Sequence, residues 1–363
     1  MEDNMNSASK VMELLGLGPL QMSLKLAIEL KLFEIINSSS GPHQSNLSAS
    51  QIASHLPTSN TTTTSTSLDR ILSLLASHSI LTTTIDEKGE RFYGLTPIST
   101  HFVPDQYGVS LGPLFMFYHD KVLMESWSYL KDRVLEGSVP FNMAHGMEIF
   151  DYMASDERFR RVFNEGLYNH SVHVMGDLLD MYKGFQEGVV GVVVDVGGGT
   201  GASMKMLVSK YPQIKGINFD LPHVIADAPP YPGKSILPAR VKHVSGDMFK
   251  GVPNGDIMFM KFILHSFDDE HCVAILKNCW NALPRHGKLL IAEYVLPSTN
   301  ISEFPDDASR LAFTLDAMML VYRAGGKERT LVEYEELGKR AGFHGMKAFP
   351  CSLGIMAMEL QKE

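Results

Sequence analysis

The sequence predicts a doubly wound α/β domain that follows a smaller, mainly helical domain. One observation is a run of β-branched residues at 189–194, typical of a buried parallel strand, directly before the glycines at 197–201. A second is the alternation of short apolar runs with helical patterns that continues to residue 292. The length of 363 residues, at about 150 residues per domain, also indicates two domains.

The first hundred residues contain helical patterns separated by turn signals. Apolar residues recur at helical spacing through 20–36, and Ser48 with Gln51 forms a capping box at the start of a short helix that ends before Pro57. The Ser/Thr/Asn-rich run at 58–67 predicts a solvated loop, because its composition is of low complexity. Helical spacing returns at 68–78.

Two short strands complete a winged-helix arrangement. They are expected at 80–85 and 90–95, with the turn at 86–89 between them. Winged helices often bind DNA, but the candidate second helix has one Arg and no Lys to contact phosphates. The chain carries 32 Lys and Arg against 41 Asp and Glu, a formal net charge of −9. A structural or dimerising role is therefore favoured, and no nucleic-acid partner is expected.

The remaining elements place a sheet behind a helical middle. Residues 120–182 are expected to be amphipathic helices, and a helix is expected at 202–210. Strands are predicted at 189–194, 214–219, 241–244, 257–262 and 288–292. Strands that alternate with helices in this way indicate a doubly wound sheet, whose ligands bind at the carboxyl ends of the strands.

Composition excludes several other classes. Three cysteines without a CxxC pair indicate neither a disulfide scaffold nor structural zinc, and no metal is expected. No run approaches the roughly 18 consecutive apolar residues of a membrane span, and the acidic, polar N-terminus does not read as a secretory signal. The expectation is a cytoplasmic protein with no membrane partner.

The glycine loop at 197–201 is the central signal of the sequence. Gly197-x-Gly199-x-x-Ala202 matches the dinucleotide pattern, and Asp220 lies 220 − 195 = 25 positions after Asp195, near the expected ribose-binding acid. A nicotinamide cofactor therefore stays open on spacing alone.

Three features favour S-adenosylmethionine instead. Asp195 immediately precedes the glycines, where it would repel a pyrophosphate and attract an ammonium group. Asp247 and Met248 follow the third strand and offer an acid beside an apolar platform for an adenine ring. Finally, a long helical region precedes the loop, whereas dinucleotide enzymes often begin with theirs.

His265 stands just past the fourth strand, where it could act as a general base toward a phenol. Glu293 ends the next strand and Glu328 follows Gly325-Gly326-Lys327, so the two carboxylates could orient the imidazole. The alternatives are a structural histidine and surface salt bridges. A phenol titrates near 10 and a histidine near 6.5, so such a base is weak and proton loss must be coupled to transfer of an activated methyl group.

These motifs resemble a known family. VVVDVGGGTGA, GDMF, FMKFILHSFDDEH and GGKERT, with YGLTPISTHFV and NHSVHVM earlier, resemble the plant caffeate/isoflavone-type small-molecule O-methyltransferases from about Leu14 onward. The resemblance implies an N-terminal winged-helix dimerisation domain at 1–112 and a Rossmann-like methyltransferase domain at 113–363. It also implies that the helical part at 113–185 contributes to the substrate pocket, and that the protein is a homodimer in which each N-terminal domain helps close its partner's pocket.

The resemblance also implies roles for individual residues. The catalytic residues would be His265, Glu293 and Glu328. The cofactor residues would be Gly197, Asp220, Asp247, Met248 and Lys261. The acceptor pocket would draw on Phe117, Tyr118, Leu123, Ile149, Met153, Phe159, Phe163, Leu167, His170, Leu315, Met318, Met319 and Arg323.

The chain departs from the family pattern near the expected base and pocket. Ser266 and Phe267 replace the usual Asp and Trp after the histidine. The caffeate-type pattern has Asn where this chain has Tyr118 and Arg323, and His where it has Met153. The replaced polar anchors favour an aromatic acceptor of a different shape from caffeic acid.

The sequence therefore predicts an S-adenosylmethionine-dependent O-methyltransferase that acts on a phenolic plant metabolite, such as a phenylpropanoid, flavonoid, coumarin, stilbene or phenolic alkaloid. An aromatic-amine N-methyltransferase is the alternative, and retention of the three catalytic candidates disfavours it, because an amine needs less help from a base. A nicotinamide-dependent oxidoreductase and a winged-helix regulator are the remaining alternatives.

Overall fold

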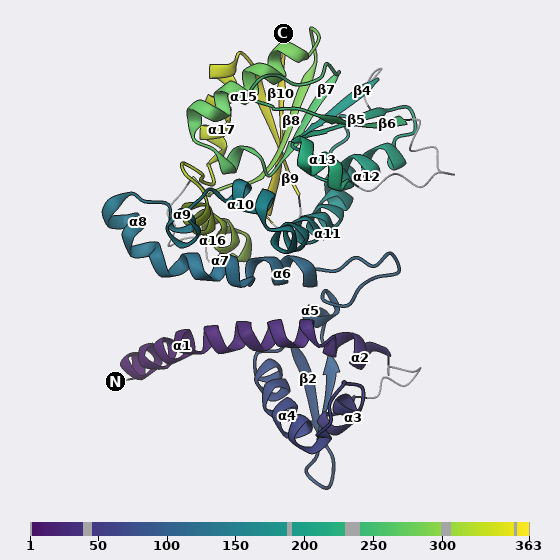
Figure 1. The fold of residues 1–363 in the computed structure, drawn as a ribbon, viewed down its shortest axis with the longest axis vertical. Coiled ribbons are helices and arrows are strands. Elements are labelled where there is room, and N and C mark those ends of the chain that lie inside the picture. Colours follow the sequence, from purple (N-terminus) through teal and green to yellow (C-terminus); the bar gives the residue numbers. More distant parts are fainter. Residues whose placement is uncertain are drawn as a thin grey trace. The chain divides into compact units, whose positions relative to one another are not determined.

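A computed structural model describes residues 2–38, 46–186, 191–228, 240–298, 306–351 and 354–362. The chain forms two compact units, Met1–His119 and Asp120–Glu363, and each is described by itself (Figure 1). The helix Gly112–Tyr118 lies in the first unit, although the sequence predicts that the second domain begins at residue 113.

Within its described residues, the first unit packs six helices with a small antiparallel sheet. The helices are α1 (Glu2–Glu29), α2 (Leu32–Ser38), α3 (Ala49–Ser54), α4 (Thr61–Ser77), α5 (Pro97–Thr100) and α6 (Gly112–Tyr118). The strands are β1 (Leu47–Ser48), β2 (Leu81–Ile85) and β3 (Arg91–Leu95), in the order β1-β3-β2. The helix pair α3–α4 followed by the β2–β3 hairpin confirms the predicted winged-helix arrangement, and the capping box of Ser48 with Gln51 is present.

The predicted loop at 58–67 is wrong, because α4 begins at Thr61. The side chain of Asn60 accepts a hydrogen bond from the backbone N–H of Thr63 at 3.1 Å, which caps the helix. Within the first turns, Ser65 and Thr66 donate their hydroxyls to the backbone carbonyl of Thr62. Local hydrogen bonds of this kind allow an exposed Ser/Thr run to be helical, whereas its composition suggests a loop.

The long helix α1 exposes an apolar surface within the first unit. Val11, Met12, Leu14 and Leu15 are each more than half exposed. By length and composition alone, Ala8–Glu29 would also be long and apolar enough to cross a membrane, a test that other apolar helices near an N-terminus pass as well. The expectation that the protein has no membrane partner therefore stays a prediction.

The second unit begins with a helical region and continues as a seven-stranded sheet. The first helices are α7 (Lys121–Ser126), η1 (Trp127–Tyr129), α8 (Leu130–Glu136), α9 (Pro140–His145), α10 (Ile149–Ser155) and α11 (Glu157–Met181). The strands are β4 (Val192–Val196), β5 (Lys215–Asp220), β6 (Val241–Ser245), β7 (Ile257–Lys261), β8 (Lys288–Tyr294), β9 (His344–Pro350) and β10 (Ile355–Gln361). The later helices are α12 (Ala202–Lys210), α13 (Pro222–Asp227), η2 (Leu264–Ser266), α15 (Asp269–Ala282), α16 (Asp307–Tyr322) and α17 (Leu331–Ala341).

The sheet confirms the predicted doubly wound topology. Its strand order is β6-β5-β4-β7-β8-β10-β9, and only β10 and β9 pair antiparallel with their neighbours. The five predicted strands lie within two residues of their expected positions, apart from residues 189 and 190, which fall outside the described residues. The two C-terminal strands were not predicted.

The order of the strands explains where the candidate residues meet. Helices α15 and α17 cover one face of the sheet, and α12 and α13 lie on the other (Figure 1). Buried side chains such as Val194, Met258 and Ile291 fill the core between the sheet and its helices. The parallel strands β4, β5, β6, β7 and β8 all end at one edge, so the side chains that follow them converge there.

Candidate active site

The glycine loop after β4 is shaped by backbone that only glycine adopts without strain. Gly197 has a φ of 73° and Gly199 a φ of 58°, both in the left-handed region. A Cβ on Gly197 would collide with Ile263, and one on Gly198 would collide with the side chain of Asn218. A Cβ on Gly199 would meet open space. The loop therefore packs closely against the sheet while its backbone at Gly199 stays open to a ligand.

Two aspartates lie beside this loop, and their side chains differ in hydrogen bonding. Asp220 accepts hydrogen bonds from the backbone N–H groups of Gly199 at 2.8 Å and Leu221 at 2.7 Å. Asp195 is 2% exposed, and its Oδ2 has no hydrogen-bond partner within the described part of the chain. Burial raises the pKa of Asp195 to about 7, although Lys261 acts in the opposite direction. An unpaired buried carboxylate fits a cationic ligand and opposes a pyrophosphate.

Two further cofactor candidates follow β6. Asp247 accepts the backbone N–H of Phe249 at 3.0 Å, which fixes the turn that begins there. Met248 is partly buried and packs against the core of the second unit. Together with Asp195 and Asp220, these residues offer carboxylates for an ammonium and for hydroxyls, with an apolar side chain for a flat ring. They therefore fit S-adenosylmethionine.

Lys261, the last residue of β7, contacts Ser171, a residue that the sequence did not indicate as part of the site. Its Nζ donates to the hydroxyl of Ser171 at 2.8 Å and lies 4.4 Å from the centre of the Phe262 ring. Burial lowers the pKa of Lys261 to about 8. Ser171 lies 90 residues away in the chain, and no local pattern marks it.

The predicted convergence of two glutamates on His265 is confirmed by the geometry. His265 lies in η2, and its Nδ1 is 2.8 Å from Oε1 of Glu328 and 3.9 Å from Oε2 of Glu293. The side chains of both glutamates are fully buried, and that of His265 is 15% exposed. Because an ionised carboxylate only accepts hydrogen bonds, Nδ1 must carry the proton in this pair. Nε2 of a neutral His265 is then free to accept a proton.

Glu293 also shapes the turn that carries the histidine. Its Oε1 accepts the backbone N–H groups of Ile263 and Leu264, both at 2.8 Å. Phe262, just before them, has a φ of 57°, a conformation that is costly for an aromatic residue. The two hydrogen bonds that Glu293 accepts stabilise this unfavourable turn, so the glutamate holds the segment in place as well as facing the imidazole.

The electrostatics of the cluster strengthen His265 as a base. Burial on its own lowers the pKa of His265, but Glu328 and Glu293 outweigh burial and raise it to about 9. Burial raises the pKa of Glu293 to about 7. The sequence-based expectation of a weak base, with a pKa near 6.5, is therefore corrected: the gap to a phenol near 10 is only about one unit.

The same three side chains meet the distance requirement for a metal site, since one ligand atom of each lies within 4.8 Å of the others. However, a separation of 2.8 Å between Nδ1 and a carboxylate oxygen is the length of a charge-assisted hydrogen bond. The geometry therefore favours a shared proton over an ion at this position.

The predicted acceptor residues come from four helices of the second unit and one of the first. Within the second unit, they are Leu123 on α7, Ile149 and Met153 on α10, Phe159, Phe163, Leu167 and His170 on α11, and Leu315, Met318, Met319 and Arg323 on or after α16. Leu123 and Phe159 are fully buried. Phe117 and Tyr118 end α6 in the first unit, with ring centres 5.0 Å apart.

Two of these residues lie close to the segment of the base. His170 stacks on Phe262 with ring centres 5.1 Å apart, and a hydrogen bond joins it to the Tyr294 hydroxyl. Burial lowers the pKa of His170 to about 3, so its ring is neutral. Arg323 donates from Nε to the carbonyl of Ser266 at 3.1 Å, and its guanidinium lies 4.2 Å from the centre of the Phe150 ring.

The fold and this site define a Rossmann-like methyltransferase. The O-methyltransferase domain family matches residues 127–344, and the O-methyltransferase dimerisation domain matches residues 12–105. The chain belongs to this O-methyltransferase family, as the motifs predicted.

Curated relatives match the whole chain. A desmethyl-yatein O-methyltransferase of Sinopodophyllum hexandrum is 53% identical over 100% of both chains. A caffeic acid 3-O-methyltransferase of Zinnia elegans is 48% identical over 97% of this chain and 96% of its own.

Among solved structures, NcsB1, an O-methyltransferase in complex with S-adenosylmethionine and 2-hydroxy-5-methyl naphthoic acid, is 25% identical with a TM-score of 0.67. That match covers 94% of this chain and 96% of the other. LaPhzM matches with a TM-score of 0.78 at 27% identity and covers 98% of this chain and 99% of the other.

Proposed function

We propose that this O-methyltransferase methylates a phenolic hydroxyl of a plant aromatic secondary metabolite, with His265 as the general base. The observation that carries the proposal is the 2.8 Å contact between Nδ1 of His265 and Glu328, with Glu293 on the same side of the ring. This arrangement leaves Nε2 as the proton acceptor and stabilises the cation that forms. This arrangement favours a phenol over an amine as the acceptor, because an amine needs less help from a base.

S-adenosylmethionine supplies an activated methyl group when it is bound. The neutral imidazole of His265 takes the phenolic proton at Nε2, and the two glutamates stabilise the resulting imidazolium. Since the pKa of His265 is about 9, proton transfer from a phenol is nearly balanced in free energy. The remaining contribution comes from holding the hydroxyl in line for transfer, which is the task of the acceptor pocket.

The acceptor we propose differs in shape from caffeic acid. Arg323 fills space between Phe150 and the carbonyl of Ser266, at a position where the caffeate-type pattern has Asn. Met153, which is buried on α10, replaces a His of that pattern. The relative that is 53% identical over the full length is named for desmethyl-yatein, which makes that compound the first acceptor to test. Phenylpropanoids, flavonoids, coumarins, stilbenes and phenolic alkaloids complete the set.

We further propose a homodimer that forms through the first unit and resides in the cytoplasm. The dimerisation-domain match and the exposed apolar residues of α1 support the dimer. Sedimentation of the purified protein tests it, and a monomer at micromolar concentration would contradict it. A fluorescent fusion expressed in plant cells tests the location.

The test of the proposed function is methyl transfer from labelled S-adenosylmethionine to the panel of phenols, with matched aromatic amines in parallel. We expect a methyl ether from at least one phenol, and exclusive methylation of amines would contradict the proposal. His265→Ala should lower kcat by about 10²- to 10⁴-fold, the usual contribution of a general base, while S-adenosylhomocysteine still binds. His271→Ala, which removes an exposed histidine paired with Asp268, is the matched control and should keep full activity. Near-normal turnover by His265→Ala would refute the assignment.

A further inference from the structure

Arg329 is a fully buried cation beside the proposed base that the function described so far does not use. We propose that Arg329 is a positioning residue, which holds the His265 segment and the Glu328 segment in register so that the two side chains meet. The proposal rests on the proposed function, in which His265 needs Glu328 to act as a base. It adds a residue that touches neither the acceptor nor the cofactor.

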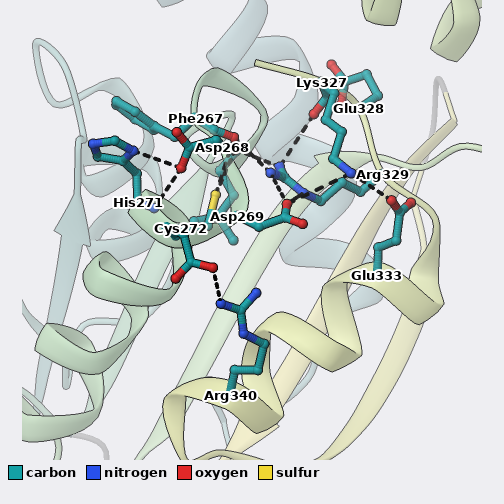
Figure 2. Close-up of polar contacts among 12 residues, drawn as sticks. Phe267, Asp268, Asp269, His271, Cys272, Lys327, Glu328, Arg329, Glu333 and Arg340 are labelled. Carbon is teal, nitrogen blue, oxygen red and sulfur yellow. Dashed lines mark hydrogen bonds and ion pairs between the residues drawn. The ribbon is translucent and has the colours of Figure 1, made fainter. Parts of the chain in front are cut away.

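The guanidinium holds the turn of His265 from both sides. Nη1 of Arg329 donates to the carbonyl of Leu264 at 2.9 Å, and Nη2 donates to the carbonyl of Phe267 at 2.8 Å. These carbonyls stand directly before and shortly after His265 in the chain. Figure 2 shows the guanidinium of Arg329 directed toward Phe267 and Asp269. Two fixed carbonyls on either side leave the segment little freedom to rotate the imidazole away.

The other donors of Arg329 anchor it to the start of α15. Nε and Nη2 both reach Oδ1 of Asp269, at 3.0 Å and 2.7 Å, and Nη1 makes a longer contact of 3.5 Å with the carbonyl of Lys327 (Figure 2). All five N–H groups of the guanidinium therefore have an acceptor. A lysine has three donors at a single point and cannot reproduce this fork.

Backbone hydrogen bonds on either side of Glu328 fix the segment that carries this glutamate. The carbonyl of Arg329 accepts the N–H of Leu296 at 3.0 Å, just past the strand that carries Glu293. The N–H of Lys327 donates to the carbonyl of His265 at 2.9 Å, so the segment that carries Glu328 is tied to the histidine itself. Arg329 thus joins, through one residue, the three segments that supply the base and its two glutamates.

The distinction between positioning and simple structural support lies in the pKa of His265. Burial alone would lower the pKa of Arg329, but nearby groups that include Cys272 and the hydrogen-bonded Asp269 outweigh burial and raise it, so the guanidinium stays charged. Replacement by lysine keeps a cationic side chain but loses the fork. If the turn then shifts, the contact between His265 and Glu328 lengthens, and the pKa of the imidazole falls from about 9 toward its ordinary value. A residue that served only the stability of α15 would change the unfolding midpoint and leave this pKa in place.

The test compares Arg329→Lys with Arg340→Lys, a control in which a more exposed arginine pairs with Glu270. We expect Arg329→Lys to lower the maximal kcat at least tenfold and the midpoint of its pH dependence by at least one unit, while the affinity for S-adenosylhomocysteine changes less than twofold. The control should match the parent. A loss of kcat with an unmoved midpoint, or a kcat within twofold of the parent, would overturn the proposal.

A second readout keeps this proposal separate from the proposed function. The NMR titration of the His265 imidazole in the parent and in Arg329→Lys needs no acceptor, so it reports the positioning even if no phenol is methylated. An unchanged titration midpoint would overturn the proposal. If Arg329→Lys does not fold, Asp269→Asn replaces it, because it weakens the acceptor of two N–H groups of Arg329. We then expect the midpoint to fall by at least half a unit, and an unchanged midpoint would again overturn the proposal.

Discussion

Replacing Glu328 by glutamine removes the charge that most directly supports the proposed base. The change keeps the size of the side chain and leaves an amide carbonyl that can still accept from Nδ1 of His265. It takes away the carboxylate that sits 2.8 Å from that nitrogen, while Glu293 remains at 3.9 Å. The variant therefore isolates charge from shape.

The size of the effect follows from the pKa of His265. The pair of glutamates raises it from 6.5 to about 9 against the opposing effect of burial. Each pKa unit corresponds to about 1.4 kcal/mol, so the net preference for the imidazolium is roughly 3.5 kcal/mol. Because Glu328 is the nearer carboxylate and makes the hydrogen bond, its loss should lower the pKa by at least about 1.5 units. In the variant, only Glu293 would oppose the lowering of the His265 pKa by burial.

The assay is the pH dependence of kcat with both substrates saturating, from pH 6 to 10. The neutral imidazole is the active form, so kcat of the parent should rise with pH to a midpoint near 9. At pH 7 only about 1% of His265 is neutral in the parent, against roughly a quarter in a variant with a pKa of 7.5. Glu328→Gln should therefore show an earlier midpoint and a lower plateau, because its base is weaker. Glu335→Gln, which changes a partly exposed glutamate paired with Lys339, is the control. A midpoint that stays near 9 in Glu328→Gln would show that Glu328 does not set the pKa of His265.

Three further predictions concern the cofactor, the acceptor and the fold. Asp195→Asn should weaken S-adenosylmethionine binding about tenfold in calorimetry, since a charged hydrogen-bond partner is worth roughly 1.5–3 kcal/mol. In the parent, the affinity should rise through pH 7 as Asp195 ionises. An affinity that is the same in Asp195→Asn and the parent would contradict the role of Asp195. Arg323→Asn should raise turnover of caffeic acid relative to the parent's best phenol, and an unchanged ratio would remove Arg323 from acceptor selection. Asn60→Ala should lower the free energy of unfolding by about 1 kcal/mol in chemical denaturation through loss of the α4 cap, and no loss would contradict that cap.

Much of the fold could be predicted because buried parallel strands leave a clear mark. Strand β4 is largely buried and begins with three valines, and the ends of the parallel strands predicted where the acids and His265 would converge. Strand β9 carries no comparable mark, since it lies at the edge of the sheet and its residues are mostly exposed. The start of α4 was not predicted, for a different reason. Hydrogen bonds that begin at Asn60 stabilise the helix although the composition of its first residues is typical of a loop.

The site was harder to predict where it depends on distance. Glu293 and Glu328 could be proposed as partners of His265, but their combined effect on its pKa needs their actual separation from the ring. Arg329 follows Glu328 in the chain and looks like a surface cation in composition. Only the folded structure shows that Arg329 is buried and that it bonds to the carbonyls of Leu264 and Phe267, which are distant in the sequence.

We propose that the strength of His265 as a base comes from two buried glutamates. The most direct measurement is an NMR titration of the His265 imidazole in the parent enzyme with S-adenosylhomocysteine bound, with the signal assigned by its loss in His265→Ala. The structure predicts a midpoint near 9, with the Nδ1 proton retained on both sides of it. A midpoint at or below 6.5 would contradict the claim, because the glutamates would then not support the base.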